Sequence, residues 1–389
     1  MKISIEPSDI KSLNRSRILR AFRENDIIQK KDLVDLLGLS ITTVTTNTRH
    51  LLKEGYIEEM GIAESTGGRK PVVFKFLKNA KVSFGVDIAP HQVTLILTNL
   101  TTEILEQRKF TVDQTTMDQT AMDDILKKVT INVEEMLQTH GYVAADCLGV
   151  GISLPGIVDE EAKVLLHAPN LKDKMYDFKA FEKTLGLDVF IENEANVAAF
   201  AELILGSAQQ IDHAVMVSIT DGVGCGIIAN HKVNKGTFKK AGEFGHMRIS
   251  DRDIQCSCGR KGCWELFSSE RALYKNYATL SGHSVSDLDA FFKLYEDGDD
   301  FASAALKRYL TDLFVGIENI MLGLDPEVII VGGEIAQYLR ELKFLEAKFM
   351  ESHHSNVLLN MNKLVFSTLA PQSAVIGSSL LPFRTLFGY

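Results

Sequence analysis

Three cysteines and a histidine are spaced so that they can hold a metal ion. Cys256, Cys258 and Cys263 fall within eight positions, and His246 precedes the first of them by ten residues. Thiolate and imidazole are ligands that Zn²⁺ prefers, and four such groups complete a tetrahedral structural site. The alternative is a set of ordinary buried cysteines, since free cysteine is among the most buried residue types. We favour the metal site because scattered core cysteines seldom show this spacing.

A helix rich in short polar side chains is predicted over residues 41–53. It follows two shorter helical patterns, and Ser40 is placed to cap its first turn. Val44, Leu51 and Leu52 are left to pack against the other helices. Hydroxyl and amide side chains reach base edges and phosphates in a major groove. The predicted DNA-contacting residues of this segment are Ser40, Thr42, Thr43, Thr45, Thr46, Asn47 and Arg49.

Two strand patterns follow this helix, at residues 56–60 and 72–76, with a glycine-rich basic segment between them. The segment carries Arg69 and Lys70, and a tip of this kind can enter the minor groove or contact phosphates. The helices and the basic wing together predict a winged helix-turn-helix DNA-binding domain over residues 1–78. The alternative is a three-helix module that binds another protein, with the basic segment as a solvated loop.

The charge distribution agrees with a DNA-binding head. Residues 1–78 carry 14 Lys and Arg against 10 Asp and Glu, whereas the whole chain carries 42 against 51 and a net charge of −9. A basic head on an acidic body places any nucleic-acid contact at the head. The surplus is small, so it supports the helix pattern and does not stand alone.

Composition and length indicate a multidomain globular protein. A chain of 389 residues is too long for one ordinary core, so two or three domains are expected. Its hydrophobic content of 45% and charged content of 24% are typical of soluble proteins. No apolar signal segment or membrane-length apolar run is present. Since three of five cysteines belong to the predicted metal site, disulfides are not expected, and we expect a cytoplasmic protein.

The remainder of the chain alternates strand and helix patterns, which predicts an α/β fold with covered sheets. The predicted strands are 82–86, 93–98, 148–152, 189–192, 214–219, 227–229 and 328–331, and a helix is predicted over 117–139. The strand at 189–192 delivers Asn193 and Glu194 to the start of a helix. Glycine-rich loops at 220–226 and 332–333 follow other strands. Such loops hold phosphates in actin-like sugar kinases, but any tight strand-to-helix turn also uses glycine.

These motifs together resemble the ROK family, whose name stands for repressors, open reading frames and kinases. The motifs that carry the resemblance are Glu243-x-x-His246, Cys256-x-Cys258-Gly259-x-x-Gly262-Cys263-x-Glu265 and Glu192-Asn193-Glu194-Ala195-Asn196. The resemblance covers nearly the whole chain. It implies a two-lobed, actin-like (ribonuclease H-like) α/β body with a sugar site in the cleft. It also implies a structural Zn²⁺ held by His246, Cys256, Cys258 and Cys263.

On this resemblance we expect a first lobe at 79–195, completed by a C-terminal helix at 373–389, and a second lobe at 196–372 with the zinc loop. The residues that the resemblance implies for sugar contact are Asn193, Glu194, Glu243, His246, Glu265, Gly156 and Asn170. Carboxylates accept hydrogen bonds from adjacent hydroxyls, and an amide both donates and accepts. His246 could bind zinc through one ring nitrogen and sugar through the other. The alternative for each residue is a structural polar group.

Two departures from the family's kinases argue against phosphoryl transfer. The kinases have an Asp-x-Gly-Gly-Thr-like phosphate loop, and the equivalent segment here is Asp87-Ile88-Ala89-Pro90-His91, without glycine or threonine. Proline also removes a backbone N–H that could bind phosphate. The kinases' catalytic Asp is replaced by Glu194, whose extra methylene moves the carboxylate by about an ångström. We therefore assign no catalytic residue.

The N-terminal head points to the repressors of the family, which carry a winged helix-turn-helix after a stretch similar to residues 12–19. Glu194 and the Cys263-Trp264-Glu265 run most resemble the xylose repressors. The resemblance implies a dimeric or tetrameric repressor of carbohydrate-utilisation genes that a sugar releases from an inverted-repeat operator. Xylose is our first candidate, with glucose or an amino sugar as other possibilities. The alternatives are a sugar kinase with an appended DNA-binding head and an interaction scaffold for a membrane-associated partner.

Overall fold

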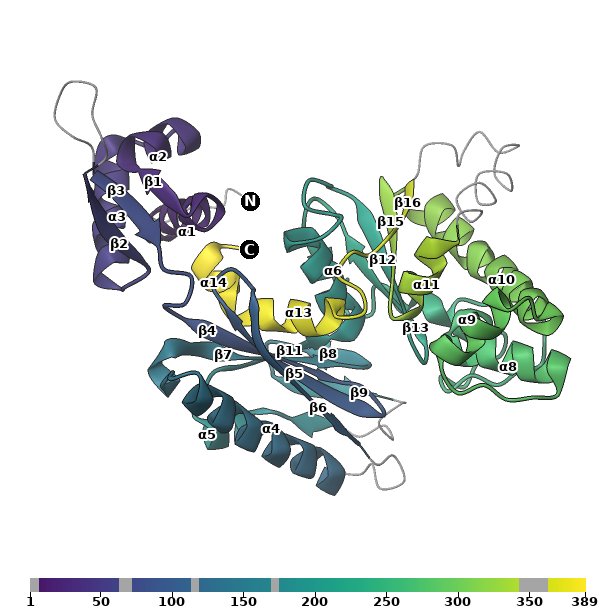
Figure 1. Cartoon of the computed structure of the whole chain (residues 1–389). Helices are drawn as coiled ribbons and strands as arrows, with labels where there is room; N and C mark the ends of the chain where they lie inside the picture. The colour runs from purple at the N-terminus through teal and green to yellow at the C-terminus, as the bar shows by residue number, and fades with distance from the viewer. Residues whose placement is uncertain (1–6, 63–71, 113–118, 169–174, 343–362) are drawn as a thin grey trace.

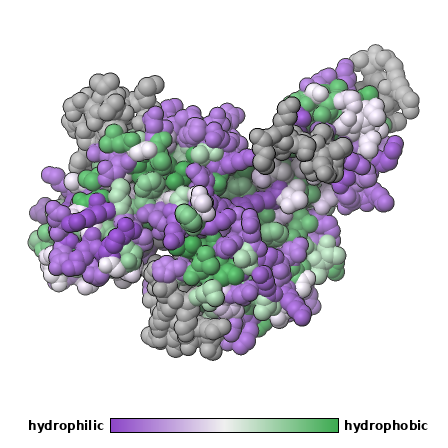
Figure 2. Space-filling model, turned by 180° about the vertical axis from the view of Figure 1, so that it is seen from behind, coloured by the Kyte–Doolittle hydropathy of each residue, from purple (hydrophilic) through white to green (hydrophobic). Residues whose placement is uncertain are grey.

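The computed structural model shows a small N-terminal head and two larger α/β lobes (Figure 1). Seen from the opposite side, the head projects from the lobes and hydrophilic residues predominate on the surface (Figure 2). The C-terminus lies beside the head, although the two are far apart in sequence. The structure describes residues 7–62, 72–112, 119–168, 175–342 and 363–389.

The head consists of three helices and a three-stranded sheet. Its elements are α1 (Pro7–Asn25), β1 (Ile27–Gln29), α2 (Lys30–Leu37), α3 (Ile41–Lys53), β2 (Ile57–Ile62) and β3 (Val72–Phe76). The strand order is β1-β3-β2, so β1 adds a third strand that the sequence pattern did not predict. Helix α3 has the predicted bounds because Ser40 Oγ accepts a hydrogen bond from Thr43 N–H at 3.1 Å. Gly38 ends α2 in the left-handed region, with φ of 64°.

The first lobe is built on a five-stranded sheet in the order β11-β7-β4-β5-β6. Its elements are β4 (Val82–Ile88), β5 (Gln92–Asn99), β6 (Ile104–Thr111), α4 (Gln119–Thr139), η2 (Ala144–Asp146), β7 (Cys147–Leu154), α5 (Lys179–Leu185) and β11 (Val189–Asn193). A small second sheet contains β8 (Ile157–Asp159), β9 (Val164–His167) and β10 (Tyr176–Asp177). Helices α4 and α5 cover the outer face of the large sheet (Figure 1). The edge strand β6 was not predicted.

The second lobe has a five-stranded sheet in the order β14-β13-β12-β15-β16. Its elements are α6 (Glu194–Ile204), β12 (Ala214–Ile219), β13 (Val223–Ile228), β14 (Val233–Asn234), η4 (Glu243–His246), α7 (Glu265–Ser268), α8 (Glu270–Ser281), α9 (Leu288–Glu296), α10 (Asp300–Leu324), β15 (Val328–Gly332), α11 (Ile335–Glu341) and β16 (Lys363–Phe366). Helices α8 to α11 lie on the side of this sheet away from the first lobe (Figure 1). Among the described helices, none is both long and apolar enough to cross a membrane.

The two large sheets share one topology. In each, three antiparallel strands come first and two further strands then run parallel to the first, giving β6-β5-β4-β7-β11 and β14-β13-β12-β15-β16. This repeated arrangement confirms the predicted two-lobed, actin-like α/β body behind a winged helix-turn-helix.

Two helices lie between the sheets and join the lobes. Helix α13 (Ser373–Leu380) packs on β4 and β7, and α6 packs on β12 and β13 and against α13. Gly85 and Gly151 make this packing possible, since a Cβ at either would overlap the backbone of α13. The chain continues as η6 (Leu381–Phe383) and α14 (Arg384–Phe387) rather than as one helix to residue 389, because Pro382 interrupts it.

Candidate functional site

The four predicted metal ligands lie together in the second lobe. Their ligand atoms all lie within 4.8 Å of one another. Cys258 Sγ is 3.7 Å from Cys263 Sγ, and Cys256 Sγ is 3.5 Å from His246 Nδ1. A tetrahedral Zn²⁺ with ordinary bond lengths requires separations of about 3.8 Å between two sulfurs and about 3.6 Å between sulfur and nitrogen. The donor set and its spacing therefore fit zinc.

Backbone turns and a buried tryptophan hold the cysteine loop in place. Cys256 N–H donates a hydrogen bond to Arg260 O at 2.8 Å, which closes the turn that carries Cys258. Gly262 has φ of 74° and lies so close to Ser250 O that a Cβ would overlap it. Trp264, the next residue after Cys263, is fully buried, and its indole N–H donates to Asp312 O of α10 at 3.1 Å. The loop is thus anchored to the longest helix of the lobe.

The predicted sugar-contacting carboxylates gather beside this loop. Glu265 begins α7, and its Oε1 lies 3.5 Å from His246 Nδ1. Glu243 Oε2 lies 3.7 Å from Nε2 of the same imidazole. A Cβ built at Gly222 would lie 3.0 Å from Glu265 Oε2, and one at Gly224 would lie 3.8 Å from Glu194 Oε1. The β12–β13 hairpin therefore lies close to both Glu194 and Glu265, and Glu243 is near enough for its charge to act on Glu194.

Glu194 is the most strongly perturbed acid of this group. Burial, and after it the charges of Asp87, Glu243, Asp221 and Glu265, together raise its pKa to about 8. These carboxylates come from distant segments of the chain and face one space. Perturbed carboxyl groups concentrated in a cleft are typical of ligand sites.

Asn193 and Gly156 form a support for this cleft. Asn193 caps α6, since its Oδ1 accepts hydrogen bonds from Ala195 N–H at 2.9 Å and Asn196 N–H at 3.1 Å. Its Nδ2 donates to Gly156 O at 2.8 Å. Gly156 has φ of 104°, and a Cβ there would overlap His167 O. Asn193 and Gly156, both predicted to contact sugar, thus position each other. Asn170, a further predicted sugar contact, lies outside the described residues.

The segment 87–91, which was compared with the kinases' phosphate loop, forms the end of β4 and the turn into β5. Asp87 and Ile88 belong to β4 rather than to a loop. Ala89 N–H donates a hydrogen bond of 3.0 Å to Gln92 O within the β4–β5 hairpin. His91 Nε2 lies 3.4 Å from Asp221 Oδ2 and bridges the two lobes. Asp87 and Asp221 bring carboxyl groups to these two turns, and the charge of each raises the pKa of Glu194.

The predicted loop at 220–226 is shorter than expected, because β13 begins at Val223. Gly226 lies inside the strand, where a Cβ would overlap Ala195 O of α6. This glycine therefore serves helix packing. Glu270 lies near the same turn, and burial, followed by the charges of Glu334 and Asp221, raises its pKa to about 8. Sequence reasoning missed Asp221 and Glu270 because neither belongs to a recognisable motif.

Helix α3 has a buried and an outward face at helical spacing. Val44, Asn47, Thr48 and Leu51 are buried, which is the pattern i, i+3, i+4, i+7. The second set is offset by two residues and consists of Thr42, Thr45, Thr46 and Arg49, of which the first and last are exposed and the other two half-buried. Ser40 is exposed and Thr43 half-buried at the start of the helix.

Asn47 does not fit the predicted DNA-contacting set. Its side chain is 3% exposed, and its Nδ2 donates to Thr43 O at 2.9 Å. We correct the prediction at this position, since a side chain packed under the helix cannot reach a base edge without leaving the core. Arg69 and Lys70 of the predicted wing tip lie outside the described residues.

Comparisons with known proteins found a family match for the two-lobed body and another for the N-terminal head. A model described as "ROK family" matches residues 83–384, and one described as "Winged helix-turn-helix DNA-binding" matches residues 12–58. The chain belongs to the ROK family. The ROK match contains the grouped acids and the cysteine loop, and the helix-turn-helix match contains α3.

The ROK relatives include named repressors of similar length. The putative xylose repressor of Caldicellulosiruptor sp. (strain Rt8B.4) is 32% identical over 90% of this chain and 91% of its own length. The xylose repressor of Bacillus subtilis (strain 168) is 30% identical over 95% and 94%. A crystal structure of a ROK family transcriptional regulator, a homologue of the E. coli MLC protein, has a TM-score of 0.79 and 26% identity and covers 97% of each chain.

Proposed function

We propose that this protein is a sugar-responsive transcriptional repressor of carbohydrate-utilisation genes, with xylose as the first candidate effector. What supports the proposal is the combination of a winged helix-turn-helix with a ROK body in which several acids gather beside the cysteine loop and the β4–β5 turn contains no glycine. The two relatives described above, which are named a putative xylose repressor and a xylose repressor, match at least 90% of the chain. Glucose and amino sugars remain in the test panel.

The sugar would lie in the cleft beside the cysteine loop. Glu194, Glu243 and Glu265 supply acceptors or, where protonated, donors for adjacent sugar hydroxyls. Asn193 would act mainly by holding the start of α6, because its amide is already hydrogen-bonded on both atoms. This arrangement supports recognition of a polyol without chemistry on it.

Zn²⁺ would be held by His246, Cys256, Cys258 and Cys263. A bound Zn²⁺ would act structurally by fixing thiolates and imidazole in one geometry. With Nδ1 of His246 turned to Cys256, Nε2 is the nitrogen that faces Glu243 and the cleft. The loop would then orient the imidazole N–H toward the ligand.

The head would bind operator DNA through the outward face of α3. Two heads of a dimer, or of a tetramer built from dimers, would place two such helices in successive major grooves of an inverted repeat. Ser40, Thr42, Thr43, Thr45, Thr46 and Arg49 form the proposed contact set, with Arg69 and Lys70 for the wing. The cytoplasm is the proposed place of action.

A sugar kinase with an appended head is the second candidate, since the fold is shared with kinases. The His91–Asp221 bridge and the engaged backbone of the β4–β5 turn argue against it. ADP release measured across hexoses and xylose should stay at background. Turnover near one per second, a typical enzyme rate, would replace the repressor proposal by the kinase.

A thermal-shift panel of xylose, glucose and N-acetylglucosamine tests the sugar site. A sugar present at 100 times its Kd should stabilise the protein by about 2.7 kcal/mol. The shift should be lost in Glu243→Gln and kept in Glu296→Gln, a matched change on the exposed end of α9. DNA affinity that is unchanged by every sugar that binds would refute the induction part of the proposal.

A further inference from the structure

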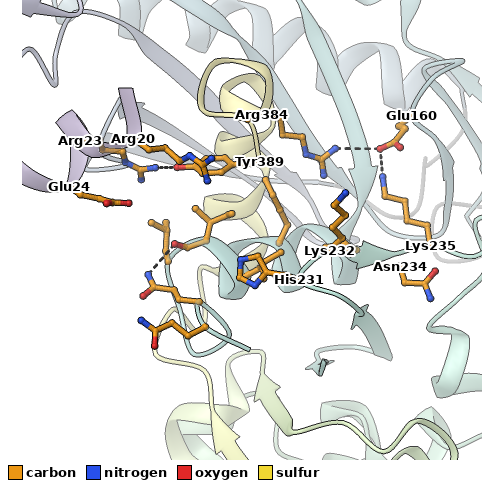
Figure 3. Close-up of a pocket in the computed structure, with 18 of the residues that line it drawn as sticks. Arg20, Arg23, Glu24, Glu160, His231, Lys232, Asn234, Lys235, Arg384 and Tyr389 are labelled. Carbon is orange, nitrogen blue, oxygen red and sulfur yellow. Dashed lines mark hydrogen bonds and ion pairs between the residues drawn. The ribbon is translucent and has the colours of Figure 1, made fainter. Parts of the chain in front are cut away.

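The head is fastened to the body through the last residues of the chain. The Arg23 guanidinium of α1 lies 5.0 Å from the ring centre of Phe387 and 5.9 Å from that of Tyr389. It donates a hydrogen bond to the Tyr389 hydroxyl (Figure 3). It donates a second hydrogen bond, of 3.0 Å, to Thr102 Oγ1. Phe387 is fully buried in an apolar cluster that contains residues of both head and body. A movement of the C-terminal segment would therefore change the contacts of Arg23 and displace α1.

A cavity of about 1370 Å³ adjoins this joint, between α1, the segment around β14 and the C-terminal residues (Figure 3). Closely packed surfaces cannot slide without repacking, but α1 and the segment around β14 are separated by this open space instead of being packed together. The cationic residues that line it are Arg20, Arg23, Lys232, Lys235 and Arg384. Two of them, Lys235 and Arg384, share one acid.

Glu160, in the turn after β8 of the first lobe, is the shared acid. Lys235, which follows β14 of the second lobe, forms an ion pair with it, and Arg384 Nη1 lies 3.5 Å from its Oε2. Burial alone would raise the pKa of Glu160, but the Lys235 ammonium and the other neighbouring groups lower it to about 2. The Arg384 guanidinium also lies 4.5 Å from the ring centre of Phe200 on α6. Glu160 therefore connects both lobes with the segment that carries the head.

Lys235 also reaches the predicted sugar site. It forms a second ion pair with Glu192, which is 2% exposed at the end of β11. Glu192 Oε1 in turn accepts hydrogen bonds from Asn193 N–H at 2.9 Å and from Asn196 Nδ2 at 3.3 Å. Lys235 thus contacts, from the other lobe, the carboxylate that holds the backbone of the Asn193–Glu194 turn.

We propose that Lys235 is a positioning residue through which sugar binding in the cleft is communicated to the DNA-binding head. This inference rests on the proposed function. Movement of the lobes around a sugar changes how Lys235 is shared between Glu192 and Glu160. The ion pair between Glu160 and Arg384 then changes, which moves α14. Because Arg23 contacts Phe387 of α14, α1 moves with it.

The test measures coupling rather than affinity. Duplex DNA that the wild-type protein selects from random inverted repeats is titrated with and without a saturating concentration of the sugar that gives the thermal shift. The ratio of the two dissociation constants is the coupling factor, which is about 5- to 150-fold in allosteric proteins. In Lys235→Gln we expect the factor to fall below about 2-fold, with Lys235→Arg retaining most of it.

Two further variants separate coupling from folding. Glu160→Gln leaves the Lys235–Glu192 pair in place, so it should lower the coupling factor while sugar affinity in the absence of DNA stays within about 3-fold of wild type. Lys232→Gln, a lysine that lines the same cavity and has no ion pair among the described residues, should behave as wild type.

A coupling factor that stays at the wild-type value in both Lys235→Gln and Glu160→Gln overturns the inference and leaves Lys235 as a structural lysine. An equal loss in Lys232→Gln overturns it as well, because the effect would then belong to the charge of the cavity. A factor of one in the wild-type protein removes the proposed induction itself, and this result needs no variant.

Discussion

Glu194 lies in a cleft where four other carboxylates raise its pKa, although an apolar or amide side chain would fill the position without this repulsion. Residues that lower stability in a cleft are commonly kept for a ligand. Glu265 lies beside Gly222 of the β12–β13 hairpin, and the charges of Glu243 and Glu265 both act on Glu194. At this scale the grouped acids are consistent with the proposed recognition of sugar hydroxyl groups.

The raised pKa of Glu194 gives a pH-dependent prediction for Glu194→Gln. The pKa is about 8 in the folded protein against 4.5 for the ordinary side chain, so the folded state favours the protonated acid. The stabilising contribution is present below pH 4.5 and is lost as pH rises through about 8. The melting temperature of the variant should therefore be close to that of the wild type at pH 5 and should exceed it by a growing margin as pH rises to 9. Glu161→Gln, an exposed control, should show no such trend, and parallel curves for Glu194→Gln would contradict the prediction.

Cys258→Ser should abolish zinc binding and lower stability. One ligand of four is lost and the loop that carries Trp264 is released, so we expect a loss on the order of 3 kcal/mol. Zinc content by mass spectrometry and thermal melting measure the two effects. Cys147→Ser, outside the cluster, should keep its zinc whatever it does to stability. A metal-free Cys258→Ser protein with an unchanged melting curve would refute the structural role.

At the scale of elements, α3 shows what local sequence does and does not determine. Its bounds could be predicted because the Ser40 cap and Gly38 act within a few residues. The burial of Asn47 was missed, although Val44, Thr48 and Leu51 share its face at helical spacing and gave a usable signal. The edge strands β1 and β6 were missed because a strand of three residues and a largely half-exposed one have weak apolar alternation.

The metal ligands could be predicted from local sequence, whereas several of the neighbouring acids could not. Cys256, Cys258 and Cys263 are close in sequence, so their spacing alone indicates a shared ion. The acids Asp221 and Glu270 come together with Glu334 only through the packing of α8 and the β12–β13 turn. Contacts of this kind depend on tertiary structure and leave no local pattern. Family resemblance placed Glu243 and Glu265 near the loop, but not the His91–Asp221 bridge.

The two faces of α3 predict different outcomes for two threonines. Thr45→Ala on the proposed DNA-contacting face should change base preference at one position by about 1–3 kcal/mol. Thr48→Ala removes a buried hydroxyl that donates to Val44 O at 2.8 Å, so it should lower stability and leave preference unchanged. Binding-site selection from random duplexes measures preference, and thermal melting measures stability. Altered preference in the second variant alone would mean that α3 does not present this face to DNA.

For the whole molecule, the duplicated sheets and the helices α6 and α13 between them explain how one cleft can serve a distant head. Helix α6 begins at the Asn193–Glu194 turn and packs on α13. The chain then passes from α13 to α14, on which α1 rests. The proposed sugar site at the first point and the DNA-binding head at the last are thus joined through packed helices. Such a body allows the two equilibria to be linked.

Linkage makes a quantitative prediction for the wild-type protein. If sugar weakens operator binding by a given factor, operator DNA must weaken sugar binding by the same factor, because both describe one thermodynamic cycle. Calorimetry of the sugar against free protein and against protein saturated with selected operator DNA measures the second factor. A duplex of scrambled sequence, at a salt concentration where it does not bind, should leave sugar affinity unchanged. Unequal factors would show that a further equilibrium, such as dissociation of a dimer or tetramer, takes part in release from DNA, and the dependence of the discrepancy on protein concentration would identify it.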